Sequence, residues 1–205
     1  MSIKIIYQDD NIVAVHKPQA LLSVPGLGPD KKDCMIARLL ELIPEAKVVH
    51  RLDCYTSGIM LFAIGIEMQR ALSRIFHDRQ IQKQYIAVVK DWFDDETGVI
   101  KFPMRCDIDD RPRQIVDYEH GKSAITYWEV LQRNGDSVRL LLKPETGRTH
   151  QLRVHCLAMG YPIIGDGLYG SDNSGQPRML LHADNLLFTH PVTKKEMHLF
   201  ARCEF

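Results

Sequence analysis

The sequence predicts an α+β protein whose core is a largely antiparallel β-sheet with flanking helices and loops. Short runs rich in β-branched residues outnumber the stretches with helical spacing. These runs also cluster as hairpins instead of alternating strictly with helices, which favours an antiparallel sheet over a doubly wound α/β fold.

The size and composition of the chain indicate one soluble domain. It has 205 residues, 45% of them hydrophobic, which is enough to bury a core without disulfides. No repeat or linker divides it, so we expect a single catalytic domain over residues 1–205. Its five cysteines form no C-x-x-C pair, which favours reduced thiols and a cytoplasmic location. The sequence lacks a signal peptide and an apolar run of about 20 residues, so no membrane is expected.

The first third of the chain begins as sheet. Residues 3–7 and 12–15 are β-branched runs around a polar turn and predict a hairpin. Apolar residues at helical spacing then predict a helix to about Leu42, with Asp33 as its N-cap and Pro44 beyond its end.

A buried strand and a second amphipathic helix follow. Residues 59–63 are an uninterrupted apolar run, introduced by a glycine that permits a tight turn. The helix is predicted over residues 67–77, and residues 84–89 form a strong strand candidate. The apolar stripe of the helix comprises Met68, Ala71, Leu72, Ile75 and Phe76.

The middle of the chain predicts a short strand, a polar lobe and a hairpin. Residues 99–102 resume the sheet, and residues 103–121 are polar and irregular, which is typical of a surface loop or small inserted lobe. Residues 124–131 and 138–142 then pair as strands around the turn at Asn134-Gly135, a strong short-range hairpin signal.

The last third contains one more helix and returns to sheet. Residues 149–159 suit a helix that Gly160 ends. Short strands are predicted near residues 186–188 and 197–201.

Three segments have the residues for chemistry. Asp53 follows His50 and Arg51 directly before the buried strand, Tyr85 enters another strand, and Arg148 follows Gly147 before a helix. A nearby guanidinium would keep the Asp53 carboxylate ionised and oriented. Tyr85 would stack on a planar substrate, and Leu152 would floor the pocket. Taken singly, such an aspartate is more often a cap or salt-bridge residue and such a tyrosine part of the core, so only the conjunction favours catalysis.

Other site types do not fit the sequence. Gly121-Lys122-Ser123 resembles the end of a phosphate-binding loop, but Val116 stands where its first glycine is needed. No G-x-S-x-G motif is present, and the histidines and acids show no metal-ligand spacing. ATP sites, serine hydrolases and metal centres are therefore disfavoured.

These segments resemble the motifs of the RluA family of pseudouridine synthases. The resemblance extends over nearly the whole chain, with the motifs in the order and separation of the family. The matching stretches are Ile5 to Pro18, His50 to Gly58, Gln82 to Val89, Gly147 to His155, and Gly165-Asp166 with Tyr169-Gly170.

The resemblance implies the isomerisation of uridine to pseudouridine in structured RNA by base flipping, with Asp53 essential and with Tyr85 and Arg148 in the active site. It is strongest to members that modify both 23S large-subunit rRNA and the tRNA anticodon stem-loop. It implies no cofactor, no metal, a monomer and no N-terminal S4-type domain. It leaves open whether Asp53 forms a covalent adduct or only removes a sugar proton.

RNA binding also needs contact residues. Arg51 is predicted to fill the gap that the flipped uridine leaves, because a guanidinium stacks on and hydrogen-bonds to bases; the alternative is an ion pair that braces the loop. Lys plus Arg and Asp plus Glu are equal at 26 each, so RNA must meet a local basic patch. The other substrate-binding candidates are His50, Thr56, Leu152, Arg70, Arg74, Arg79, Arg111 and Arg113.

Three alternatives remain open at this stage. The chain would be a synthase for rRNA or tRNA alone, an RNA-binding chaperone with vestigial catalytic motifs, or an enzyme of glycosyl transfer on free nucleosides. Intact acid, tyrosine and arginine motifs argue against the chaperone, and the basic clusters argue against a nucleoside enzyme.

Overall fold

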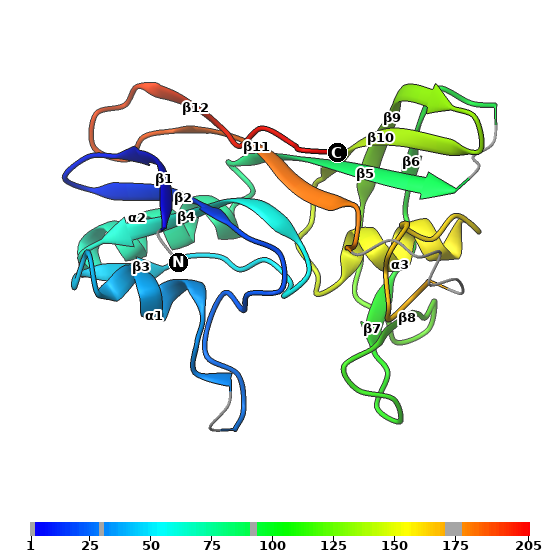
Figure 1. The fold of residues 1–205 in the computed structure, drawn as a ribbon, viewed down its shortest axis with the longest axis horizontal. Helices are drawn as coiled ribbons and strands as arrows, with labels where there is room; N and C mark the ends of the chain where they lie inside the picture. Colours follow the sequence, from blue (N-terminus) through cyan, green and yellow to red (C-terminus); the bar gives the residue numbers. More distant parts are fainter. Residues whose placement is uncertain (1–2, 29–30, 91–93, 171–177) are drawn as a thin grey trace. The chain divides into compact units, whose positions relative to one another are not determined.

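The computed structural model describes residues 3–28, 31–90, 94–170 and 178–205 (Figure 1). The chain forms two compact units, the first from residues 1–83 and 182–204 and the second from residues 84–181 with Phe205. It leaves the first unit within strand β5 (Gln82–Lys90) and returns at the start of β11 (Leu181–Thr189). The single catalytic domain over residues 1–205 stays a prediction.

The first unit is built on a sheet with the strand order β1-β2-β4-β11, in which β3 also pairs with β4 and β12 with β11. Among the strand pairs described in this unit, β4 and β11 are the parallel one. The elements are β1 (Lys4–Gln8), β2 (Ile12–Lys17), α1 (Met35–Leu40), β3 (Ala46–Val48), β4 (Ser57–Ile64), α2 (Ile66–His77) and β12 (Glu196–Phe200).

Strands β2 and β4 form the centre of this unit. Both are almost continuously buried, as expected for strands covered on both faces. Helix α2 packs against β3 and β4, and α1 packs against β3. The predicted stripe of α2 is confirmed, because Met68 and Leu72 are buried while Arg70 and Arg74 are exposed.

The second unit contains an antiparallel sheet with the order β5-β10-β9-β6. A separate hairpin, β7 with β8, is not part of this sheet. The elements besides β5 are β6 (Thr97–Ile100), β7 (Met104–Cys106), β8 (Gln114–Val116), β9 (Thr126–Asn134), β10 (Ser137–Pro144) and α3 (Gln151–Ala158).

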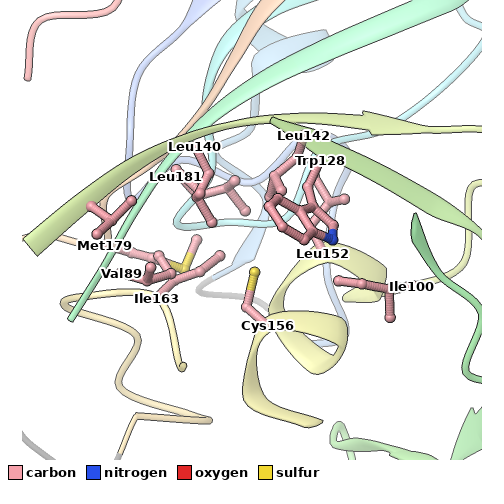
Figure 2. Close-up of a cluster of buried hydrophobic side chains, with 12 residues drawn as sticks. Val89, Ile100, Trp128, Leu140, Leu142, Leu152, Cys156, Ile163, Met179 and Leu181 are labelled. Atoms are coloured by element: carbon pink, nitrogen blue, oxygen red, sulfur yellow. The ribbon is translucent and has the colours of Figure 1, made fainter. Parts of the chain in front are cut away.

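Helix α3 closes the core of the second unit (Figure 2). Leu152 and Cys156 from the helix join Trp128, Leu140 and Leu142 from the sheet in one buried apolar cluster. At 25 cal/mol per Å² of buried apolar surface, each fully buried side chain of this size contributes about 2 kcal/mol relative to exposure. The position of the segment that precedes α3 is therefore set by a packed core.

Most predicted elements are confirmed within a few residues, including both amphipathic helices, the Asn134-Gly135 hairpin and the largely antiparallel sheet. The predicted N-cap is wrong, because Cys34 occupies the N-cap of α1 and the Asp33 carboxylate instead bonds Arg38 at 2.6 Å. The lobe over residues 103–121 is not wholly irregular, since it contains the β7–β8 hairpin. In the part of the chain that the structure describes, no helix has the length and apolarity of a membrane span.

Candidate active site

Asp53 lies in a turn directly before β4. The backbone N–H of Thr56 donates to the Asp53 carbonyl at 3.1 Å, and β4 begins at Ser57. The Asp53 side chain is half-buried, while Thr56 is buried and Arg51 is exposed. The chain thus presents the aspartate in the turn that leads into the buried strand β4 and leaves Arg51 exposed to solvent.

Gly58 is needed at the start of β4, but for a different reason from the predicted tight turn. Its φ is +117°, and a Cβ atom there would lie 2.1 Å from the carbonyl oxygen of Ala183. The parallel pairing brings Ala183 of β11 opposite this glycine. Only glycine permits this close approach of the two backbones.

Ser23 anchors the residue before Asp53. Its hydroxyl donates to the carbonyl of Leu52 at 2.7 Å and accepts from the N–H of Leu52 at 3.0 Å. Ser23 is buried, so both groups of Leu52 would lack a partner without it. One side chain therefore fixes the backbone on the N-terminal side of Asp53.

Lys17 anchors the residue after Asp53. Its ammonium is fully buried and donates to the carbonyls of Pro18 at 2.9 Å, Leu21 at 2.7 Å and Cys54 at 3.0 Å. Burial lowers the pKa of Lys17 to about 8, and nearby Cys54 and Asp53 partly offset this shift by favouring the charged form. The Asp53 turn thus has a buried positive charge beneath it.

His50 joins the residues before the Asp53 turn to strand β4 through a hydrogen bond. Its Nε2 accepts the N–H of Leu61 at 2.9 Å, so the proton of the neutral ring is on Nδ1. The ring stacks on Phe76 with 4.6 Å between centroids. Burial, with a smaller effect of the Lys83 charge, lowers the pKa of His50 to about 3. The substrate-binding role of His50 stays a prediction, and only its Nδ1 edge is available for it.

Arg148 lies in a segment whose backbone is held by hydrogen bonds to the Gln151 side chain. The Gln151 carbonyl oxygen Oε1 accepts the Arg148 N–H at 3.0 Å and the Thr146 hydroxyl at 2.7 Å. Its amide Nε2 donates to Ile125 O at 2.9 Å and to Thr126 Oγ1 at 3.0 Å. The Arg148 side chain is exposed, and its Nε donates to Ser123 O at 3.1 Å.

Tyr85 and Leu152 also belong to the second unit. Tyr85 is half-buried on β5 opposite Leu142 of β10, and it packs against the apolar cluster that contains Leu152. Asp53 belongs to the first unit. The predicted ion pair of Asp53 with Arg148, and the roles of Tyr85 and Leu152 toward a substrate, stay predictions.

The arginines predicted to contact RNA are all exposed. Arg70 pairs with Glu67 at 2.7 Å, and Arg113 pairs with Asp110 at 3.1 Å. Exposed pairs of this kind contribute at most about 1 kcal/mol, so phosphate can replace the carboxylate. The five side chains are Arg70, Arg74, Arg79, Arg111 and Arg113.

The sequence reasoning missed the side chains that hold the two segments in place. Gln151 lies within the matching stretch Gly147 to His155, but no role was assigned to it, and none was assigned to Ser23 or Thr146. Lys17 gave one signal, because a lysine that ends a strand with four consecutive apolar residues, Ile12 to Val15, and directly precedes a proline is badly placed for a solvated charge. Among the described residues, no three His, Cys, Asp or Glu side chains are grouped as metal ligands would be.

Comparison with known proteins places these features in context. Residues 11–158 match the model of the RNA pseudouridylate synthase family. The chain is 45% identical to the dual-specificity RNA pseudouridine synthase RluA of Yersinia pestis over 204 residues, which covers 98% of this chain and 99% of the relative. It is also 45% identical to RluA of Escherichia coli strain K12, with 98% and 93% covered.

Solved structures agree with the sequence comparison. Human RNA pseudouridylate synthase domain containing 1 superposes with a TM-score of 0.82 at 28% identity, covering 98% of this chain and 83% of the human chain. Human RNA pseudouridylate synthase domain containing 4 gives a TM-score of 0.78 at 25% identity, with 98% and 88% covered. The α+β fold is thus shared with solved chains of this type.

Proposed function

This chain belongs to the RNA pseudouridylate synthase family, and on that premise we propose that it converts one uridine in 23S rRNA and one in the tRNA anticodon stem-loop to pseudouridine. The dual specificity that names the RluA relatives, at 45% identity over nearly the whole chain, supports two RNA substrates. The five free thiols are compatible with work in the cytoplasm, which is part of the proposal.

Asp53 starts the reaction in this proposal. The carboxylate attacks C1′ of the ribose or removes the proton from C2′, and the bond from C1′ to N1 of uracil breaks. The uracil turns and its C5 bonds to C1′; on the first route the bond between C1′ and the Asp53 carboxylate breaks in this step, and on the second route the proton returns to C2′. The proton on C5 then leaves while N1 gains one, so product and substrate are isomers. The observation that carries the proposal is the Asp53 turn, fixed by Ser23 and Lys17 on either side of a half-buried carboxylate.

Arg148 and Tyr85 complete the site. Arg148 pairs with Asp53 and holds it ionised, and its exposed guanidinium has the fork geometry that such a pairing uses. Tyr85 stacks on the uracil and stands near the proton that leaves C5. Leu152 closes the floor of the pocket, and His50 and Thr56 are further substrate-binding residues in this proposal.

The target uridine enters the active site after it is extruded from the folded RNA, which costs a few kcal/mol of stacking and pairing. Arg51 fills the gap, a role supported by its exposure two residues before Asp53. The exposed arginines of α2 and of residues 103–121 neutralise phosphates, so binding weakens steeply with added salt.

The decisive experiment is the substitution Asp53→Asn. We expect pseudouridine formation in RNA labelled with tritium at C5 of uridine to fall about a thousandfold or more, since the carboxylate is the reacting group. RNA affinity and the circular dichroism spectrum stay close to those of the wild type. Asp33→Asn is the matched control, because Asp33 is an exposed acid bound to Arg38, and it keeps full turnover.

Two outcomes would contradict this proposal. Substantial residual turnover by Asp53→Asn would remove the aspartate from the chemistry. Turnover of free uridine by the wild type without RNA would identify a nucleoside enzyme instead.

Mapping of pseudouridine in total RNA with and without the gene separates dual from single specificity, because the dual enzyme accounts for one site in each RNA class.

A further inference from the structure

We propose that Tyr169 is a positioning residue for the isomerisation, because its phenol ties the hairpin lobe to the segment that holds Arg148. The hairpin lobe is defined as residues 103–121, which contain β7, β8 and the exposed Arg111 and Arg113. The inference rests on the proposed function, in which this lobe meets RNA and Arg148 acts in the active site.

The link begins at the lobe. The backbone N–H of Gln114, the first residue of β8, donates to the Tyr169 hydroxyl oxygen at 2.8 Å across 55 residues of sequence. The same oxygen lies 2.8 Å from Nδ1 of His150. One hydroxyl thus joins an atom of the lobe to a side chain two residues after Arg148.

Tyr169 is held rigidly enough to transmit position. Its backbone N–H donates to Oδ1 of Asp166 at 3.1 Å, and its ring is buried beneath the Arg153 guanidinium, 4.9 Å from the centroid. Arg153 and Asp166 form two buried hydrogen bonds of 2.7 Å. Burial opposes ionisation of Asp166, but the bonds and charge of Arg153 hold the pKa of the carboxyl below its usual value.

The other end of the link is a constrained residue. His150 has φ of +55° and is the N-cap of α3, with no side-chain cap hydrogen bond. Histidine adopts this left-handed conformation more often than most residues, though at some cost. The phenol fixes the ring of a residue whose backbone conformation sets the direction of the chain between Arg148 and α3.

Two anchors therefore act on the Arg148 segment. Gln151 binds the Arg148 backbone to the sheet at Ile125 and Thr126, and Tyr169 binds His150 to the lobe. The lobe also touches α3 through the apolar cluster of Met104, Val116 and Val154, but the Tyr169 hydroxyl is the polar link that joins the lobe to His150. Misplacement of a reacting group by about 1 Å costs up to about a hundredfold in rate, so this link matters for turnover.

The test is Tyr169→Phe, which removes one oxygen and leaves the ring, its contact with Arg153 and the backbone bond to Asp166. We expect the single-turnover rate on saturating RNA to fall about tenfold or more, while RNA affinity changes less than about twofold. Tyr7→Phe is the matched control, because it also deletes a hydroxyl bonded at 2.8 Å, there to Asp9 on the first unit. That variant keeps the wild-type rate.

A double-mutant cycle separates positioning from stability. His150→Gly accepts φ of +55° without strain and removes the partner of the phenol, so Tyr169→Phe should change the rate less than about twofold in that background. The inference would be overturned if Tyr169→Phe lowered the rate equally in both backgrounds, or if Tyr169→Phe alone kept the wild-type rate. It would also be overturned if Tyr169→Phe regained the full rate on cooling, because the loss would then come from reduced stability and not from lost positioning. Inactivity of the wild type itself would instead overturn the proposed function.

Discussion

The Asp53 turn and the Arg148 segment are both fixed by buried polar side chains, but the two anchorings differ in kind. Asp53 is held by Ser23 and Lys17, which bond residues 29 and 37 positions away in sequence. Arg148 is held by Gln151, a neutral amide only three positions away. The first anchoring uses a buried charge and a hydroxyl that reach backbone groups far away in sequence, whereas the second uses one neutral amide that joins the nearby Arg148 backbone to the sheet at Ile125 and Thr126.

Loss of the charged anchor should have the largest effect on stability. Lys17→Met removes the donor of three carbonyl groups, and hydrogen bonds to charged groups contribute about 1.5 to 3 kcal/mol each. Relief of the buried charge offsets part of this loss. We expect the free energy of unfolding in urea to fall by about 3 kcal/mol at pH 7.

The control for that substitution is Lys143→Met. Lys143 is a half-buried lysine with 42% of its side chain exposed, paired with Glu129 at 3.0 Å, and its loss should cost less than about 1 kcal/mol. If Lys17→Met proved as stable as the wild type, the free-energy cost of burying the ammonium would equal the stabilisation from its three hydrogen bonds. The contrast between the two anchors would then disappear.

Loss of the neutral anchor should have a smaller effect. Gln151→Met removes four hydrogen bonds, but the Arg148 and Ile125 groups that it leaves are only partly buried, so water can replace some partners. We expect a loss of about 2 kcal/mol in the same urea titration. Hydrogen exchange should show the added opening around Thr146 and Arg148 and leave β2 and β4 protected. A loss as large as that of Lys17→Met would break the comparison.

The same contrast explains what could be predicted from sequence. Helix α2 and the β9–β10 hairpin follow from local signals, an apolar stripe and the Asn134-Gly135 turn, and both were found. The reactive candidates Asp53, Tyr85 and Arg148 were identified because each lies in a dense motif. Their roles stay predictions; Asp53 and Arg148 lie shortly before β4 and α3 as expected, while Tyr85 lies within β5 and not at its start.

The rest could not be read from local patterns. Ser23 and Lys17 act through tertiary hydrogen bonds whose partners are backbone atoms, and backbone atoms leave no mark on the sequence. Strands β7 and β8 have three residues each, too few to show a period. Asp33 was predicted as a cap on propensity alone, but Arg38 on the next turn offers it a charged partner.

A pH titration should reveal the smallest of these effects, in the segment that leads to Asp53. The pKa of His50 is about 3 in the folded protein and near 6.5 when unfolded, so protons bind mainly to the unfolded chain in between. Stability from His50 is therefore complete above pH 6.5 and is lost as the pH falls toward 3. Between pH 7.5 and 5.5 this loss amounts to about 1.4 kcal/mol.

The substitution His50→Leu isolates that contribution from the other histidines. The variant loses the acceptor for the Leu61 N–H and starts less stable at pH 7.5, but its free energy of unfolding should fall by about 1.4 kcal/mol less than that of the wild type on acidification to pH 5.5. Parallel pH profiles would mean that His50 titrates normally in the folded protein. The Asp53 turn would then have a solvated histidine behind it, and its rigidity would rest on Ser23 and Lys17 alone.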